Sequence, residues 1–182
     1  DSQTQASWVG MGWSLDTGYI VRNQNGTKGY LADDTFILVL NGASYQLIER
    51  ADDPDNNPNT ADYRTRDEAF LRIRRTLQRD SSNTQKDAST WQVTDKSGNQ
   101  YLFTDLAQYP MEGCDNPLIE TWRWSLTQAR SATSTVNVIS YTYFHETAMK
   151  RDCDKEGKPN YQTDLAVYPE TITYPNGKYQ IT

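Results

Sequence analysis

The side chains best suited to metal or redox chemistry in this chain are two cysteines and one histidine: Cys114, Cys153 and His145. A structural zinc site uses four such ligands, so these three cannot complete one. His145 lies on a β-prone run, where a lone histidine is more often an edge residue than a catalytic base. The sequence therefore predicts no metal site and no cofactor.

Other catalytic patterns are equally weak. Residues 12–16 read GWSLD, which lacks the second glycine of the G-x-S-x-G nucleophile elbow. A phosphate-binding glycine loop is absent from the sequence. The paired carboxylates of a glycosidase meet through the fold, and nothing in the sequence singles out two of them. We therefore expect a protein that is not an enzyme.

Two polar segments are rich in residue types that can bind ions in other proteins. The loop 51–62, ADDPDNNPNTAD, has four aspartates, but their spacing departs from the EF-hand pattern, so a solvated loop is favoured. The segment 63–79, YRTRDEAFLRIRRTLQR, offers six arginines to a phosphate or sulfate group. The favoured interpretation is a solvated strand face whose arginine stems cover aromatic rings. These arginines are Arg64, Arg66, Arg72, Arg74, Arg75 and Arg79.

Aromatic residues supply much of the apolar mass, with 12 Tyr, 5 Trp and 4 Phe in a chain that is 36% hydrophobic. Trp122 and Trp124 alternate along one predicted strand and are expected to share a face. Such rows usually form the buried side of a sheet. On an exposed surface they would instead stack on sugar rings. The candidate glycan-stacking residues are Trp122, Trp124, Tyr109, Tyr161 and Tyr168.

The composition restricts the classes of partner. The 182 residues carry 18 Lys and Arg against 24 Asp and Glu, a net charge of −6. This balance disfavours nucleic acid and anionic membranes, and no apolar run approaches the roughly 20 residues that span a bilayer. No signal peptide opens the chain, and residues 179–182 read as mid-strand. We expect a single β-rich domain over residues 1–182, excised from a longer protein.

The elements that must position these side chains read as β-strands. The stretch 7–23, rich in Trp and Gly, reads as the opening of a β-structure. Residues 63–79 fit a helix or a strand, and periodicity does not decide between them. We predict an all-β fold of about ten antiparallel strands, arranged as a sandwich or a curved sheet. Paired β-prone runs around turn residues predict hairpins over 36–49, 91–104, 122–144 and 168–181.

The two cysteines flank the predicted hairpin 122–144. Antiparallel pairing would bring Cys114 and Cys153 together, and a disulfide there would stabilise the fold by roughly 3–4 kcal/mol. The alternative is two free thiols in a reducing cytosol. We favour the disulfide, and with it an exported protein.

Five motifs follow one another along nearly the whole chain. They are GMGWSLDTGYIVRN (10–23), DDTFILVLNG (33–42), WQVTDKSGNQYLF (91–103), TWRWSLTQA (121–129) with ISYTYFHE (139–146), and YPETITYPNG (168–177). In this order they resemble the large bacterial Rhs or YD-repeat proteins, which include toxin-complex B components and SpvB-like proteins. The turn 129–135 departs from the family pattern because it lacks a glycine.

The resemblance implies a structural, non-enzymatic role. In that family, the matching region belongs to a shell of β-hairpins that encloses a toxic or reactive C-terminal part. We therefore expect a wall segment of a secreted or cell-surface bacterial protein, with neighbouring β-repeats of the same chain as its partners. The alternative is a carbohydrate-binding module that recognises polysaccharide through exposed Trp and Tyr.

Overall fold

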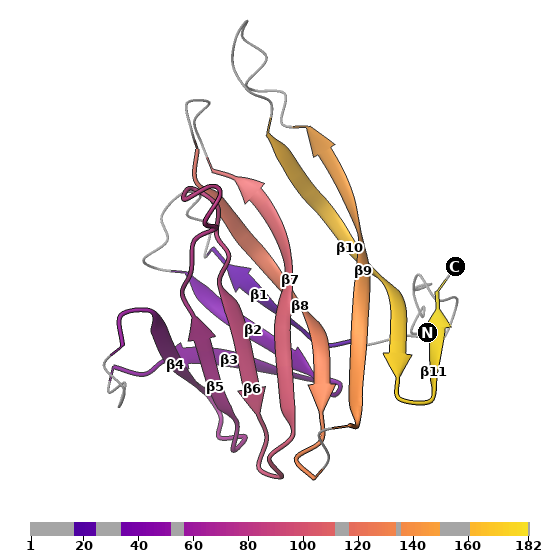
Figure 1. Cartoon of the computed structure of the whole chain (residues 1–182). Coiled ribbons are helices and arrows are strands. Elements are labelled where there is room, and N and C mark those ends of the chain that lie inside the picture. Colours follow the sequence, from indigo (N-terminus) through magenta and orange to yellow (C-terminus); the bar gives the residue numbers. More distant parts are fainter. Residues whose placement is uncertain are drawn as a thin grey trace, which may run out of the picture.

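The computed structural model describes residues 17–24, 34–51, 57–111, 117–133, 136–149 and 161–181. These residues form eleven β-strands and no helix (Figure 1). The strands are β1 (Tyr19–Asn23), β2 (Thr35–Leu40), β3 (Ala43–Glu49), β4 (Thr60–Thr65), β5 (Arg72–Thr76), β6 (Thr90–Thr94), β7 (Gln100–Pro110), β8 (Ile119–Arg130), β9 (Val138–Met149), β10 (Gln162–Tyr174) and β11 (Gly177–Gln180). The all-β prediction is confirmed.

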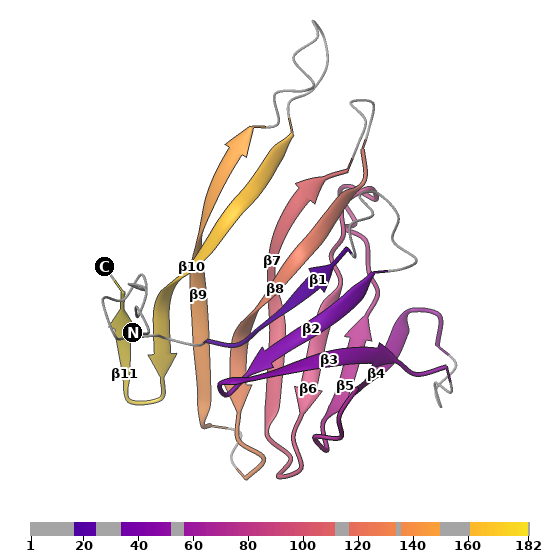
Figure 2. The ribbon, with the colours of Figure 1, turned by 180° about the vertical axis from the view of Figure 1, so that it is seen from behind.

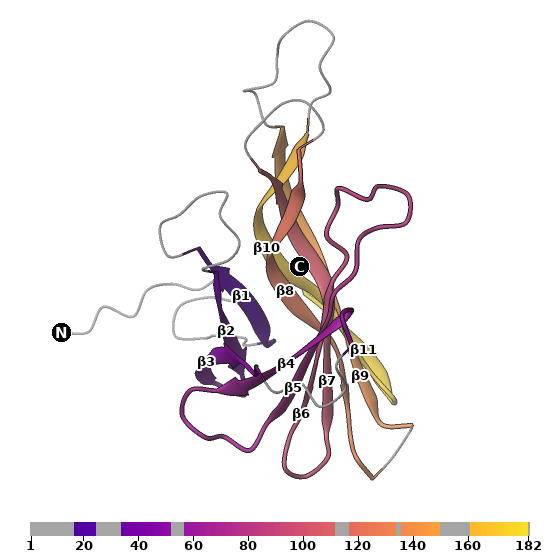
Figure 3. The ribbon, with the colours of Figure 1, turned by 90° about the vertical axis from the view of Figure 1, so that its left-hand side faces the viewer.

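Strands β1 to β8 close into an antiparallel barrel. Each strand pairs with the next, and β1 also pairs with β8, where Ile20 lies opposite Trp124. From behind, β1 to β3 cross in front of β5 to β7 (Figure 2), and the side view places these two groups on opposite walls (Figure 3). The structure makes the predicted sandwich or curved sheet more specific, because the sheet curves until β1 pairs with the edge of β8 and closes a barrel.

Local turn chemistry forms the hairpins. Asn41 and Gly42, between β2 and β3, have φ angles of 53° and 76°, as a tight two-residue hairpin turn requires. Between β6 and β7, Gly98 has a φ of 84°, and the Asp95 carboxylate accepts a hydrogen bond from the Ser97 N–H at 2.8 Å. The predicted hairpins that the structure confirms are 36–49, 91–104 and 168–181.

Residues 63–79 form strands rather than a helix. Tyr63 of β4 pairs with Ile73 of β5, and the chain reverses between the two strands. Phe70 adopts a φ of 54° in this reversal, a conformation that interrupts a right-handed helix. Ile73 points into the core while Arg72 is exposed. Pairing with neighbouring strands thus decides between the helix and the strand that periodicity left open for residues 63–79.

An aromatic cluster fills the barrel. Trp91 and Trp124 are 1% and 0% exposed, and their ring centroids lie 5.8 Å apart, near edge-to-face. Tyr63 and Phe36 approach Trp91 to 4.8 Å and 5.0 Å. Offset and edge-to-face contacts of this kind stabilise aromatic cores beyond their buried area. The interior is therefore a packed core along most of its length.

Strand β8 carries the chain out of the barrel. Its residues 123–125 pair with β1, whereas residues 128–130 pair with β9, so the predicted hairpin 122–144 pairs only at its turn end. A register shift between Ala107 and Gln108 marks a β-bulge at Trp122. Trp122 therefore packs against a second cluster, and Trp124 against the barrel core. The prediction that these two rings share a face is wrong, because the bulge interrupts the alternation.

Strands β9, β10 and β11 extend the sheet beyond the barrel (Figure 1). The β9–β10 hairpin packs on β7 and β8 through the second cluster, which contains Ala107, Tyr143 and Val167. The Tyr143 hydroxyl donates to the Leu126 carbonyl at 2.6 Å. The molecule is thus a barrel with a ribbon attached to its wall.

Some predictions fall outside the described residues. They include residues 7–16 of the opening stretch and both cysteines, so the disulfide stays a prediction. No described segment forms a helix that could cross a membrane.

Candidate functional site

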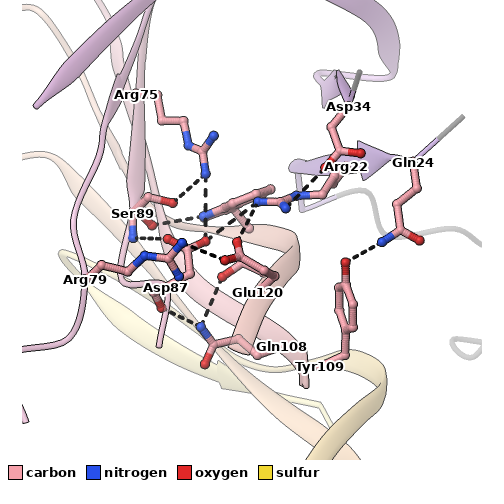
Figure 4. A network of polar contacts seen from close by, with 12 residues as sticks. Arg22, Gln24, Asp34, Arg75, Arg79, Asp87, Ser89, Gln108, Tyr109 and Glu120 are labelled. Atoms are coloured by element: carbon pink, nitrogen blue, oxygen red, sulfur yellow. Dashed lines mark hydrogen bonds and ion pairs between the residues drawn. The ribbon is translucent and has the colours of Figure 1, made fainter. Parts of the chain in front are cut away.

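One region of the barrel holds a half-open cavity of about 580 Å³ with both polar and apolar walls. Its walls come from β1 to β5, the segment 77–89 and the start of β8. Figure 4 shows the charged side chains that meet there. Three guanidinium groups and three carboxylates meet there, and we call this set the barrel network. Its members are Arg22, Arg75, Arg79, Asp34, Asp87 and Glu120.

Arg22 lies at the centre of the network although it ends an apolar strand. Its side chain is 3% exposed, and its two Nη atoms lie 3.3 Å from Asp34 and 3.3 Å from Glu120. The guanidinium also lies 5.9 Å from the Phe36 ring centroid and 5.7 Å from that of Trp124. Carboxylates and aromatic faces thus compensate a charge that would be costly to bury alone.

Arg75 extends from β5 to the same rings. Its guanidinium carbon lies 5.0 Å from the Phe36 centroid and 5.2 Å from that of Trp124, and Nη2 donates to the Ser89 hydroxyl at 3.0 Å. Burial lowers the pKa of Arg75, and the charge of Asp87 opposes that shift. Burial likewise raises the pKa of the neighbouring Tyr63 hydroxyl to about 12. The arginine stem therefore belongs to the core as well as to the cavity.

Glu120 joins two parts of the cavity wall. Its side chain is 3% exposed and contacts Arg22 at 3.3 Å and Arg79 at 2.7 Å. The side chain of Arg79 is 40% exposed, and its Nη1 also donates to the Gln85 carbonyl at 3.3 Å. Glu120 consequently links the barrel interior to the segment 77–89.

Residues 80–90, DSSNTQKDAST, have the composition of a polar loop, and the structure shows part of this segment held in place by the barrel. Asp87 accepts a hydrogen bond from the Ser89 N–H at 2.9 Å, and its carbonyl accepts one from the Gln108 amide at 2.6 Å. The Trp124 indole donates to the Ser89 carbonyl at 2.9 Å. These contacts come from strands that are distant in the sequence, so the sequence alone could not show that this segment is held in a fixed position.

The barrel network pairs acids with guanidinium groups. These ion pairs join side chains from distant parts of the chain, which suits a structural role. In the described part of the chain, no three His, Cys, Asp or Glu side chains are arranged to hold a metal ion. The geometry therefore offers packing, charge compensation and a small half-open cavity.

The predicted arginine cluster does not gather at one site. Arg75 and Arg79 line the cavity, whereas Arg74 Nε lies 2.7 Å from Asp62. The hydrogen bond from Arg74 lowers the pKa of Asp62, with burial opposing it. Arg66 donates to Gln46 at 2.8 Å. The favoured interpretation, a solvated strand face with arginine stems over aromatic rings, is confirmed only in part, because the Arg75 guanidinium lies near aromatic rings but its side chain is 12% exposed.

The candidate glycan-stacking residues lie in separate places. Trp124 is fully buried and cannot offer a ring to a sugar, and Trp122 is half-buried against the second cluster. The Tyr109 hydroxyl accepts a hydrogen bond from Gln24, and burial raises its pKa. Tyr161 is half-buried. Tyr168 is 37% exposed.

Tyr168 is the most exposed member of that set. Its cross-strand partner on β10–β9 is Phe144, which is 58% exposed. Its hydroxyl donates to Glu146 at 3.3 Å. The structure thus places one tyrosine and one phenylalanine side by side on the ribbon, and does not assemble the predicted set into one surface.

His145 forms a bridge between the ribbon and the barrel wall. Its Nδ1 lies 3.1 Å from Asp164 on β10, and its Nε2 lies 3.1 Å from Asp105 on β7. A doubly protonated ring donates to both carboxylates, whereas a neutral ring has one N–H. Burial raises the pKa of Asp105, and His145 opposes that shift. Asp164 also accepts the Gln108 N–H at 2.6 Å.

Replacing His145 with alanine is expected to loosen the β9–β10 hairpin while the barrel stays folded. The change leaves Asp105 and Asp164 facing each other, and hydrogen exchange of β9–β10 amides should accelerate about tenfold or more. The pKa of Asp105 is higher in the folded than in the unfolded state, so protonation of Asp105 stabilises the fold. This contribution is fully present below about pH 4 and is lost as the pH rises through the raised pKa. The loosening should therefore be smaller in acid. Leu165→Ala, at a 56% exposed position of β10, is the control, and unchanged exchange in His145→Ala would contradict the bridge.

Comparisons with known proteins agree with this architecture. The model of one protein family, described as SpvB, Salmonella virulence plasmid 65kDa B protein, matches residues 1–182. A search of curated proteins found no match. The N-terminal domain of effector protein SpvB from Salmonella typhimurium strain LT2 matches with a TM-score of 0.60 and 19% identity, over 96% of this chain and 56% of that one.

A second solved structure, TcdB2-TccC3-TEV, matches with a TM-score of 0.56 and 18% identity, over 90% of this chain and 8% of that one. At these identities, both structures show a shared fold. The SpvB part of the resemblance seen in the sequence is confirmed by the family match. The part that concerns Rhs or YD repeats stays a prediction.

Proposed function

The chain belongs to the family of the Salmonella virulence plasmid 65kDa B protein, and from this membership we propose that it is a structural, non-catalytic β-module of a toxin-associated protein. In this proposal the barrel is a rigid unit of a β-shell wall, and the ribbon connects it to neighbouring β-repeats of the same longer chain. The protein would be secreted or displayed at a bacterial cell surface.

The observation that carries the proposal is the way the sheet ends. The barrel closes through β1 and β8, but the sheet continues through β9 and β10 to β11, which pairs with β10 alone among the described strands. All four β11 residues are at least partly exposed, Tyr179 at 62%. An unpaired strand edge is a template for a further strand. The ribbon therefore suits the end-to-end joining of β-units.

The site geometry favours a structural role over catalysis. The carboxylates of the barrel network form ion pairs with guanidinium groups, and both ring nitrogens of His145 contact carboxylates that hold the ribbon on the barrel wall. Relatives of similar fold include a domain of a protein named as an effector. A stable wall unit is the role that these contacts support best. A surface platform for glycans has less support, since Trp124 is in the core.

Hydrogen exchange at the open edge tests the proposal. The register places Tyr179 opposite Ile172 and Lys178 opposite Thr173, so in a two-residue hairpin the N–H of Lys178 points away from β10. We expect this amide to exchange at least about tenfold more slowly in a longer natural chain than in the 182-residue chain.

Lys178→Pro removes the outward donor without removing a bond to β10, and should abolish the added protection of the neighbouring Gln180 amide. Lys178→Ala keeps the donor and is the matched control. Equal exchange of Lys178 in the short and the long chain would show that β11 has no strand partner.

A further inference from the structure

We propose that the barrel cavity binds a small neutral polyhydroxylated molecule of monosaccharide or disaccharide size. This goes beyond the structural role, and it places sugar recognition inside the barrel rather than on an exposed aromatic surface. A cavity of about 580 Å³ is within the usual size range of small-molecule sites, and barrels of eight strands can hold one small ligand.

Buried polar atoms in the cavity lack hydrogen-bond partners among the described residues. They are Asp87 Oδ2, Arg22 Nε and Arg75 Nε. Asp87 Oδ2 lies 3.8 Å from Arg75 Nη2 and 4.0 Å from Arg22 Nη2. These separations are too long for direct hydrogen bonds, and a buried polar atom without a partner is destabilising. No water-sized group reaches these atoms in the structure, so a ligand hydroxyl would join them after a small movement of the Asp87 and arginine side chains that line the cavity.

A hydroxyl group is the chemistry that fits between them. It donates one hydrogen bond and accepts others, so one oxygen about 2.8 Å from both Asp87 Oδ2 and a guanidinium nitrogen satisfies the two at once. A carboxylate or phosphate could accept from the arginines but would repel Asp87. An ammonium group could approach Asp87 but would face Arg22 and Arg75.

The charges of the cavity disfavour an anionic ligand most strongly. The barrel network holds three cations and three anions, and Glu49 adds a fourth carboxylate to the lining, which leaves an excess of one negative charge. An anionic ligand would add to that excess in a partly desolvated space, and a cationic ligand would meet the three guanidinium groups. The rings of Phe36 and Tyr63 also line the cavity, and they offer apolar faces to the C–H side of a sugar ring. A lining with both polar and apolar groups matches a molecule that has both kinds of surface.

Isothermal titration calorimetry of the 182-residue chain tests this proposal. The neutral probes are glucose, galactose, mannose, maltose and lactose, and the charged probes are glucuronate, glucosamine and inorganic phosphate. We expect saturable binding of at least one neutral saccharide, and we expect the charged probes to bind at least about tenfold more weakly. Binding of none of the probes, or preference for a charged probe, would overturn the proposal.

Two variants locate the site. Asp87→Asn removes the charged acceptor and should weaken saccharide binding about tenfold or more. Leu77 lines the cavity and is 39% exposed, so Leu77→Trp should obstruct the cavity and abolish binding without touching the barrel network. Gln92→Trp, on an exposed position of β6, is the matched control and should bind as the unmodified chain does. Undiminished binding in a folded Leu77→Trp variant would place the ligand elsewhere and overturn the proposal.

Discussion

Replacing Trp91 with alanine is expected to lower the free energy of unfolding by about 3–5 kcal/mol. Trp91 is 1% exposed and lies within 6 Å of three other aromatic rings, at 4.8, 5.0 and 5.8 Å. Its removal leaves a cavity that the rigid barrel can fill only in part. Because domains of this size are stable by about 5–15 kcal/mol, the variant should be close to unfolding.

Urea denaturation followed by circular dichroism measures this loss. Tyr179→Ala is the control, since Tyr179 is 62% exposed and exposed substitutions usually change stability by less than about 0.5 kcal/mol. A loss below about 1 kcal/mol in Trp91→Ala would mean that the ring does not pack in the core as the structure shows. Iodide should also fail to quench the fluorescence of the core tryptophans, because their rings are shielded from solvent.

Glu120→Ala is expected to cost about 3–5 kcal/mol, because removal of one partner leaves a buried charge uncompensated. The carboxylate contacts Arg22 at 3.3 Å and Arg79 at 2.7 Å, and Arg22 is 3% exposed. Glu120→Gln keeps the shape and an acceptor oxygen, so it should lose less stability. The expected order of stability is unmodified chain, Glu120→Gln and Glu120→Ala.

Urea denaturation at low and high salt distinguishes this network from surface ion pairs. Buried pairs are poorly screened, so the loss in Glu120→Ala should persist in about 1 M salt, where the Debye length is about 3 Å. Glu170→Ala is the control, because Glu170 is an exposed residue that accepts a hydrogen bond from Thr142 at 3.3 Å. A loss that disappears at high salt would contradict a buried network.

Much of the local structure could be predicted from the sequence. Asn41-Gly42 and the turn at Gly98 specify hairpins because their positive φ angles suit few other residues. Alternation in β2, where Phe36, Leu38 and Leu40 are buried, reports which face of a strand is apolar. These signals lie within a few neighbouring residues, so they can be recognised without knowledge of the rest of the fold.

The candidate site could not be predicted in the same way. Arg22 and Glu120 are 98 residues apart along the chain, and Arg22 reads as the polar end of an apolar strand. A charge becomes buried only where distant strands supply its partners. The arginines of 63–79 were noticed, but their separation into Arg75 in the core and Arg74 beside Asp62 follows from the register of β5. Alternation in the sequence shows which face of a strand is apolar, but it does not show which side chains that face will meet across the barrel.

By itself, the sequence determined the β-class, most hairpins and the aromatic character of the core, because turn chemistry and side-chain alternation act locally. The tertiary structure alone decided closure, the bulge and the cavity. Closure needs β1 to meet β8, a choice set by the tilt and stagger of all eight strands together. The bulge at Trp122 then turns that ring away from Trp124. Such features depend on which strands meet, and this is a property of the assembled sheet rather than of any segment.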